Sequence, residues 1–158
     1  VYPGGAAPFT GDVAVRGDRI LAVGENLRVT AGRTIDASGL IVAPGFVDPH
    51  AHMEGWLTAD DPQRRLVAPF LLQGVTTTFV GNDGFGPVDV KPLLASAQSK
   101  PVSINHATFT GFGSIRSAVI GPARRAPTAA ELTQQQALVR QAMCDGALGL
   151  STGLFYAP

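Results

Sequence analysis

Residues 44–52 read PGFVDPHAH, and the pattern of the chain changes at this point. Pro44 and Gly45 predict a turn, and the apolar residues after them predict a short strand that ends in two histidines. Alternate side chains of a strand point to the same side, so His50 and His52 can project together from the strand end. Two convergent imidazoles make half of a divalent-metal site. We therefore expect both histidines to bind a metal ion.

The chain before this stretch shows only β patterns. Residues 12–16 alternate, a turn signal follows at residues 17–19, and residues 20–23 are apolar, which together predict a hairpin. Residues 34–36 and 40–42 are predicted to form two further short strands. No helix fits this region, so the sequence predicts an N-terminal segment made of β structure alone.

Predicted strands and helices alternate after Pro44. We expect strands at 46–48, 75–80, 102–107 and 147–151, and helices at 60–73, 88–99 and 128–144. This alternation predicts parallel strands joined by right-handed crossovers. Four such units amount to half of a closed eight-stranded barrel, which needs about 200 residues or more. A doubly wound open sheet is the alternative. In both folds the catalytic and ligand-binding residues lie at the carboxyl ends of the strands.

The predicted helix at 128–144 has the clearest local signals. Thr128 is the expected N-cap, and Glu131 completes a capping box. The residues expected to form its apolar stripe are Leu132, Leu138, Val139 and Met143. Cys144 beside this stripe is expected to be buried. For the helix at 60–73, we expect Asp61 to act as the N-cap.

A carboxylate follows the second predicted strand. Asp83 lies in the loop GNDGFG at residues 81–86, whose spacing matches neither a phosphate-binding loop nor a dinucleotide fingerprint. At a strand end it could reach a metal held by His50 and His52, and the alternative is a loop that only turns the chain. His106 is expected to be a packed histidine. Asp48 is expected either to orient an imidazole or to form a turn.

Composition narrows the classes of partner. The 158 residues carry 12 basic and 12 acidic side chains, so we expect no nucleic-acid or membrane-surface binding. Cys144 is the only cysteine, which leaves no intrachain disulfide. No apolar run approaches the roughly 18 residues of a membrane span. The chain begins at Val1 without Met and stops directly after an apolar segment, so we expect it to be truncated at both ends.

Several motifs resemble the amidohydrolase superfamily. They are VAPGFVDPHAH at 42–52, QGVTT at 73–77, VGNDGFG at 80–86 and GALGLSTGLFY at 146–156, with the β segment at 11–24. The first motif is typical of the superfamily as a whole. The last two are closest to its N-acyl-D-amino-acid deacylase (D-aminoacylase) branch. The likeness covers nearly the whole chain.

The resemblance implies an α/β fold, namely the N-terminal half of a (β/α)8 TIM barrel preceded by a small β-sandwich segment. Residues 1–43 would belong to the sandwich, and residues 44–158 would form the first four βα units. It also implies one or two zinc ions, or another divalent metal, at the barrel mouth. His50, His52 and Asp83 match metal-ligand positions, and Phe155 and Tyr156 match the wall of the acyl pocket.

The activity that the resemblance implies is metal-dependent hydrolysis of the amide bond of N-acyl-D-amino acids, with metal-activated water as the nucleophile. The general-base aspartate is expected beyond Pro158, and the rest of the barrel would come from the same polypeptide or from a second chain. The expected location is the cytoplasm, or the periplasm or exterior if a signal peptide precedes Val1. The alternatives are a cyclic-amide or dipeptide amidohydrolase and a metal-free, non-catalytic homologue.

Two positions depart from the family pattern. Asp83 stands where many D-aminoacylases carry a metal-ligating cysteine, so a harder oxygen ligand replaces a thiolate and should weaken the preference for zinc. Phe112 lies in a Gly-Phe-Gly sequence where family members often have Gly-His-Gly. A phenyl ring neither donates a hydrogen bond nor binds a metal. We therefore expect this chain to lack the polar contact that the histidine makes in family members.

Overall fold

The computed structural model describes residues 1–156. The chain divides into two compact units, Val1–Gly45 and Phe46–Pro158. Among the described residues, the helices are too short or too polar to cross a lipid bilayer.

The first unit contains one β-hairpin. Strand β1 (Asp12–Arg16) pairs with β2 (Arg19–Gly24) in antiparallel register. Gly17 adopts a left-handed φ of +60° in the turn between them, a conformation that glycine reaches without steric cost. The Asp12 carboxylate accepts a hydrogen bond from the backbone N–H of Leu27, which ties the hairpin to the chain that follows it. The predicted hairpin is confirmed.

The two further strands predicted for the first unit are wrong. Residues 34–36 and 40–42 form no strand. Ile35 and Ile41 are 73% and 72% exposed, so their side chains find no apolar partner within the described residues. A strand needs a neighbouring backbone to satisfy its N–H and C=O groups. Here the hydrogen bond from Tyr2 N–H to Val42 C=O does not extend into a ladder.

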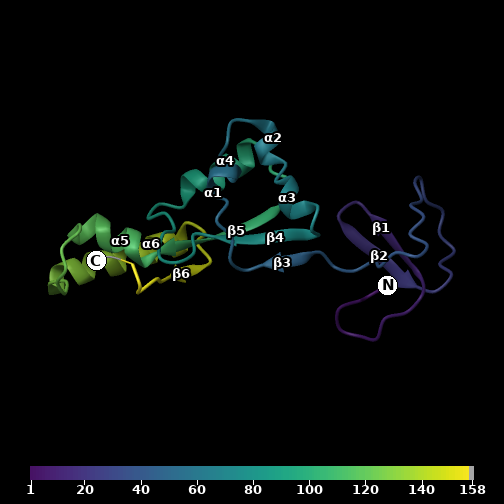
Figure 1. The fold of residues 1–158 in the computed structure, drawn as a ribbon, viewed down its shortest axis with the longest axis horizontal. Helices are drawn as coiled ribbons and strands as arrows, with labels where there is room; N and C mark the ends of the chain where they lie inside the picture. Colours follow the sequence, from purple (N-terminus) through teal and green to yellow (C-terminus); the bar gives the residue numbers. More distant parts are fainter. Residues whose placement is uncertain (157–158) are drawn as a thin grey trace. The chain divides into compact units, whose positions relative to one another are not determined.

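The second unit is built on a parallel sheet (Figure 1). Its strands are β3 (Phe46–Asp48), β4 (Val75–Val80), β5 (Asn105–Gly111) and β6 (Gly149–Ser151), side by side in that order. Each neighbouring pair is parallel, as predicted. The carboxyl ends of the four strands therefore meet at one edge of the sheet, where the loops that follow them lie close together.

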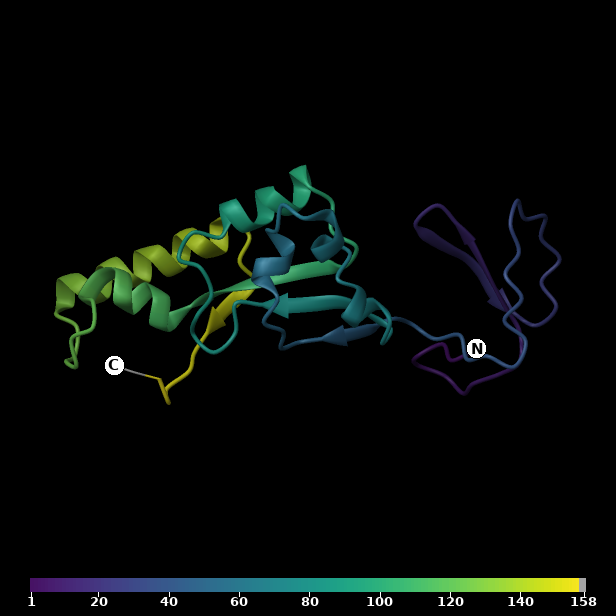
Figure 2. The same cartoon turned by 45° about the horizontal axis from the view of Figure 1, so that its top comes forward.

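Six helices connect these strands within residues 46–156. They are α1 (Glu54–Leu57), α2 (Pro62–Arg65), α3 (Ala68–Leu71), α4 (Lys91–Ser99), α5 (Phe112–Ile120) and α6 (Ala129–Cys144). In both views α1 to α4 lie on one side of the sheet (Figures 1 and 2). The sequence predicted α4 and α6, although α4 begins three residues later than expected. It did not predict α1 or α5.

The single helix predicted at 60–73 is two helices. Asp61 caps α2 as expected, since its side chain accepts a hydrogen bond from Gln63 N–H. The break falls at Val67, whose φ is +52°. Pro69 explains the break, because proline has no N–H to donate and its ring would collide with the carbonyl four residues earlier in a continuous helix. Val67 is fully buried, and this burial offsets the strain of its backbone.

The third strand also differs from its prediction, which placed it at 102–107. Residues 102–104 are not part of β5, because the Ser103 N–H donates to the carbonyl of Arg65 instead of to the sheet. The strand continues to Gly111. His106 therefore lies near the start of β5, far along the strand from its carboxyl end.

Helix α6 confirms its predicted cap but not its predicted buried face. Thr128 accepts a hydrogen bond from Glu131 N–H, and the Glu131 side chain accepts one from Thr128 N–H. The buried residues are Gln135 and Ala142, whereas Leu132 and Met143 of the predicted stripe are exposed. Cys144, which was expected to be buried, is exposed as well. Ala142 packs with Val90 and Ala147, whereas Leu132 and Met143 lie on a face of α6 that the described residues do not cover.

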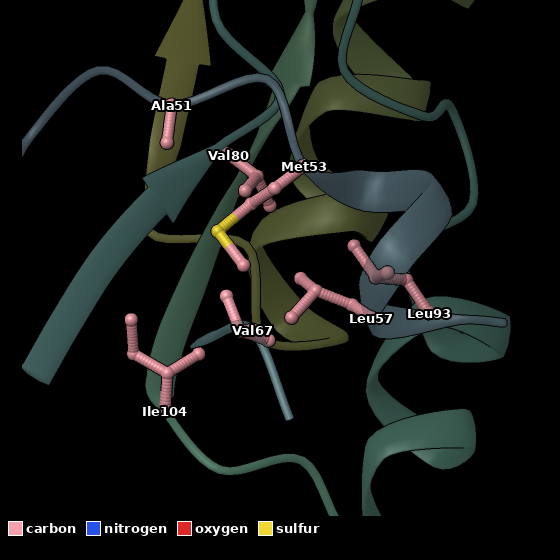
Figure 3. Close-up of a cluster of buried hydrophobic side chains, with 7 residues drawn as sticks. All are labelled: Ala51, Met53, Leu57, Val67, Val80, Leu93 and Ile104. Atoms are coloured by element: carbon pink, nitrogen blue, oxygen red, sulfur yellow. The ribbon is translucent and has the colours of Figure 1, made fainter. Parts of the chain in front are cut away.

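The main core lies between the helices and β4. Its buried members are Ala51, Met53, Leu57, Val67, Val80, Leu93 and Ile104. Figure 3 shows the Met53 side chain reaching from the chain after β3 toward Val80 on β4. Full burial of a side chain of this size contributes roughly 1.5–3 kcal/mol. The segment that follows β3 is thus anchored by its own apolar residues.

A buried arginine organises the same region. The Arg65 side chain is almost fully buried, and its guanidinium donates hydrogen bonds to the backbone carbonyls of Leu57, Ala59, Ser96 and Pro101. These carbonyls belong to α1, α4 and the loops that follow them. A guanidinium presents five N–H donors in a planar fork, so one side chain can satisfy several carbonyls at once. Arg65 thereby joins three segments of the helical layer.

Candidate metal centre

His50 and His52 leave the chain just after β3. The strand ends at Asp48, so the histidines lie beyond it rather than at its last positions. The alternation expected of a strand nevertheless persists, because Ala51 and Met53 are buried while His50 and His52 are exposed. The Ala51 N–H donates to the carbonyl of Phe79 on β4, which holds this extended segment beside the sheet. Both imidazoles consequently emerge on the same side.

Asp83 reaches the same place from the end of β4. The loop 81–84 has left-handed backbone at Gly81, Asp83 and Gly84, with φ values of +80°, +57° and +82°. A Cβ atom on Gly81 would collide with the carbonyl oxygen of Phe109, so glycine is required there for steric reasons. Aspartate tolerates the left-handed region better than most residues do. This sharp turn directs the Asp83 carboxylate toward β3.

Asn82 joins the two segments. Its buried side-chain amide donates to the carbonyls of Ala51 and Phe79 at 3.2 Å and 2.9 Å. Ala51 lies between the two histidines, and Asn82 directly precedes Asp83. The carbonyl of Ala51 and the backbone of the Asp83 loop are therefore linked through one amide group.

The three predicted ligands converge. Nε2 of His50 and Nε2 of His52 each lie 3.2 Å from the same atom, Oδ2 of Asp83. The two rings are 5.2 Å apart between centroids, with an angle of 65° between their planes. One ligand atom from each residue lies within 4.8 Å of the others. The side chains are partly open to solvent, with exposures of 55%, 56% and 30%.

These distances fit a metal ion. Two ligands that each lie 2.0–2.2 Å from one ion at a tetrahedral angle are separated by about 3.3–3.6 Å, slightly more than the two separations of 3.2 Å found here. Two imidazoles and a carboxylate are also a ligand set that zinc uses in hydrolytic sites, with a fourth position left open. The donor atoms present are therefore compatible with one divalent ion.

An open pocket of about 280 Å³ adjoins the cluster. Its lining comes from the carboxyl ends of the strands and the loops after them, namely Pro49, His50, Asn82, Asp83, Phe109, Leu150, Ser151 and Thr152. Thr152, the residue directly after β6, is part of this lining. Space for a small molecule thus exists directly beside the candidate ligands.

Other candidates lie outside the cluster or act on the backbone. Asp48 accepts a hydrogen bond from the His50 N–H at 3.0 Å, so it shapes the turn. Partial burial lowers the pKa of His106, which favours a neutral, packed imidazole as expected. Arg116 donates to the carbonyls of Ala123 and Arg125 and closes the loop after α5.

Phe155 and Tyr156 follow β6. The ring of Tyr156 packs against the ring of Phe85, with 4.7 Å between their centroids. Phe85 lies two residues after Asp83 in the chain. The Phe155 side chain, in contrast, is 96% exposed. Phe112, the second departure from the family pattern, begins α5. The structure therefore places one of the two predicted pocket residues against the Asp83 loop and leaves the other in the open.

Two residues that hold the site were not singled out as site residues in the sequence. Glu54 is one of them, and its carboxylate accepts a 2.7 Å hydrogen bond from the N–H of Gly81. Ser151 was interpreted only as part of a strand, but its hydroxyl contacts the Asp83 loop. No spacing rule links residue 54 or 151 to residue 81, so a local pattern could not have found these contacts.

A family model matches most of the chain. Residues 33–153 match the model described as the amidohydrolase family. The chain belongs to the amidohydrolase family. Within that family it is similar to the D-aminoacylase branch.

A D-aminoacylase from Alcaligenes xylosoxydans xylosoxydans is 35% identical over 93% of this chain and 34% of its own length. The crystal structure of a D-aminoacylase superposes with a TM-score of 0.86 at 36% identity, over 96% of this chain and 36% of that one. The N-acyl-D-glutamate deacylase of Bordetella bronchiseptica, solved with zinc and a phosphonate inhibitor, gives a TM-score of 0.83 at 33% identity over 98% and 36%.

These comparisons confirm the predicted fold class. The parallel sheet corresponds to the N-terminal half of a (β/α)8 barrel preceded by a β segment, which excludes the doubly wound alternative. The chain spans about a third of the length of each of these relatives.

Proposed function

We propose that this chain belongs to a metal-dependent hydrolase that cleaves the amide bond of N-acyl-D-amino acids. It would provide the metal ligands that come first in the order of the barrel strands. The observation that carries the proposal is the meeting of His50, His52 and Asp83 at one point. Two imidazole nitrogens share one carboxylate oxygen at 3.2 Å, and an open pocket adjoins them. Relatives named as D-aminoacylase and N-acyl-D-glutamate deacylase support the substrate class.

His50, His52 and Asp83 would hold the ion, which is zinc or another divalent metal. A bound divalent ion supplies Lewis-acid polarisation of the substrate carbonyl and lowers the pKa of water to about 7. The residues of this chain set the geometry. The buried Ala51 and Met53 fix the direction of both imidazoles, and the left-handed turn at Asp83 fixes the carboxylate.

The pocket beside the ligands would hold the acyl amino acid. Its lining combines the apolar side chains of Phe109 and Leu150 with the hydroxyls of Ser151 and Thr152. Such a mixture suits a substrate with an apolar acyl group next to a polar amide. Phe155 and Tyr156 are proposed to extend this wall, since Tyr156 already packs on Phe85 beside the Asp83 loop.

We further propose that more strands close the barrel, supplied by the same polypeptide or by a second chain. Residues 1–43 would belong to a small β-sandwich domain, and residues 44–158 would form the first four βα units. Strands β3 and β6 stand at the two ends of the strand order. Apolar side chains beside β6, such as Leu148 at 57% exposure, would be covered by such strands.

The experiment compares metal content with activity in the full-length protein. Purified protein is analysed for zinc, manganese, iron and cobalt, and hydrolysis of N-acetyl-D- and N-acetyl-L-amino acids is followed by release of the free amino group. We expect bound divalent metal and a preference for the D substrates. We also expect His50→Ala and His52→Ala each to lose metal and activity together, because each removes one ligand.

His106→Asn is the matched control. It replaces a histidine of the same sheet that lies near the start of β5 and away from the cluster. This variant should retain its metal and its activity. Protein that carries no stoichiometric metal, with His50→Ala unchanged in activity, would overturn the proposal and favour a metal-free homologue.

A further inference from the structure

One hydroxyl holds both sides of the Asp83 turn. Ser151 is the last residue of β6. Its Oγ donates a hydrogen bond to the carbonyl of Gly81 at 2.6 Å and accepts one from the N–H of Gly84 at 3.0 Å. Gly81 and Gly84 flank Asn82 and Asp83 in the chain. The serine thus links the two ends of the four-residue turn that carries the candidate carboxylate ligand.

This link spans a long distance in the sequence. Gly81 and Ser151 are 70 residues apart, and β6 is not the neighbour of β4 in the sheet. The loop crosses the carboxyl end of β5 to reach β6, because Gly111 N–H donates to the Gly86 carbonyl and Ser114 N–H donates to the Gly84 carbonyl. The position of the turn is therefore set by β5, β6 and the start of α5 together.

The turn needs such support because its backbone is strained. Asp83 has a φ of +57°, a conformation that costs a residue other than glycine about 1–3 kcal/mol. A strained residue persists only where its surroundings hold it in place. The hydrogen bond that the Ser151 hydroxyl donates to Gly81 and the one that it accepts from Gly84 oppose the relaxation of this turn. Relaxation would rotate the Asp83 carboxylate away from the two imidazoles.

We propose that Ser151 is a positioning residue for the metal centre: its hydroxyl holds the Asp83 turn in the shape that aims the carboxylate at His50 and His52. This inference rests on the proposed metal site, and it assigns Ser151 a role in holding the metal ligand in addition to its place in the pocket lining. Outer partners that orient a ligand typically change metal affinity 10–100-fold when they are removed. We expect an effect of that size.

The test uses the full-length protein with the variants Ser151→Ala and Ser151→Thr. Zinc dissociation constants are measured by competition with a chromophoric chelator, and the visible spectrum is recorded after cobalt loading. Ser151→Ala should bind zinc about 10–100-fold more weakly and show an altered cobalt spectrum, because the carboxylate is no longer held in place. Ser151→Thr keeps the hydroxyl and should restore both the affinity and the spectrum.

Thr110→Val is the matched control. It removes another part-buried hydroxyl, which donates to the Pro87 carbonyl at 2.8 Å on the neighbouring strand β5. This variant should unfold at a lower temperature with its zinc affinity unchanged. Equal losses of affinity in Thr110→Val and Ser151→Ala would overturn the inference, since the effect would then reflect packing alone.

The outcomes separate the inference from the proposed function. A wild-type protein that binds no metal overturns the proposed function and the inference with it. A wild-type protein that binds zinc, with Ser151→Ala equal to it in affinity and cobalt spectrum, overturns only the role of Ser151. A loss in Ser151→Ala that Ser151→Thr does not recover also overturns that role.

Discussion

The Nε2 atom of His50 lies 3.2 Å from the Oδ2 atom of Asp83, although 33 residues separate the two in the chain. Parallel pairing of β3 with β4 brings the ends of both strands to the same edge. The side chain of Asn82 then links the carbonyl of Ala51 to the turn that carries Asp83. The contact is therefore a product of backbone organisation at two strand ends, and the side chains complete it.

Asp83→Asn should abolish most of the metal affinity. The amide has nearly the same shape as the carboxylate, and asparagine also tolerates the left-handed backbone that Asp83 adopts. The change therefore removes the negative charge without adding strain. We expect the zinc dissociation constant to rise by about 100-fold or more. This exceeds the roughly 10–100-fold effect of removing a residue that only hydrogen-bonds to a metal ligand. Isothermal titration calorimetry with zinc measures it, and an unchanged constant would show that Asp83 is not a ligand.

Asp83→Cys should change the choice of metal. A thiolate is softer than a carboxylate, so sulfur favours zinc over harder ions such as manganese. We expect the ratio of zinc to manganese affinity to rise by about tenfold or more relative to the wild-type protein. Competition titrations with the two metals give this ratio. A ratio that stays constant would indicate that residue 83 does not contact the ion.

Glu54→Ala should destabilise the protein through the Gly81 N–H. That buried N–H donates to the Glu54 carboxylate at 2.7 Å and would lose its acceptor. A buried donor without a partner costs about 1–3 kcal/mol in the free energy of unfolding. Glu54→Gln retains an acceptor oxygen and should recover most of the loss. Urea unfolding of the three proteins checks this, and equal losses in both variants would assign the effect to charge.

Arg65→Met should destabilise the helical layer without altering the metal site. The guanidinium serves four backbone carbonyls, and methionine fills similar volume but donates to none of them. We expect the free energy of unfolding to fall by about 2 kcal/mol or more. Arg64→Met, on an exposed neighbour, should change it by less than about 0.5 kcal/mol. Urea denaturation distinguishes the two, and a similar effect in both would contradict the role of Arg65.

Acid should weaken the cap of α6. Hydrogen bonds from Arg125 and from the Thr128 N–H lower the pKa of Glu131 to about 2. A carboxyl with a depressed pKa stabilises the folded form above its unfolded pKa, and this stabilisation is lost as the pH falls through its folded pKa. An end-blocked peptide of residues 124–144 contains no other side-chain carboxyl group. Its helicity by circular dichroism should fall between pH 5 and pH 2.

The matching peptide with Glu131→Gln tests the cause. It cannot titrate at this position, so its helicity should stay constant over the same pH range. A peptide pair with identical pH profiles would contradict the assigned role of Glu131. The peptide isolates the cap from the rest of the protein, where other carboxylates titrate in the same range.

Local patterns predicted much of the fold because the information they use is local. The turn residues around β1 and β2, the β-branched run of β4 and the capping box of α6 each lie within a few residues of the element they define. The strands predicted at 34–36 and 40–42 failed because an extended segment becomes a strand only with a partner edge. Pro69 was a local signal for the break at Val67.

The sequence by itself determined the kinds of donor atom at this site and the strand ends that carry them. His50, His52 and Asp83 follow two predicted strands, and parallel strands place such residues at one edge. Only the tertiary structure decided that one oxygen of Asp83 faces both imidazoles. It also decided that Ser151 and Glu54 hold the turn, because hydrogen bonds across 70 and 27 residues depend on strand order and loop path rather than on sequence spacing.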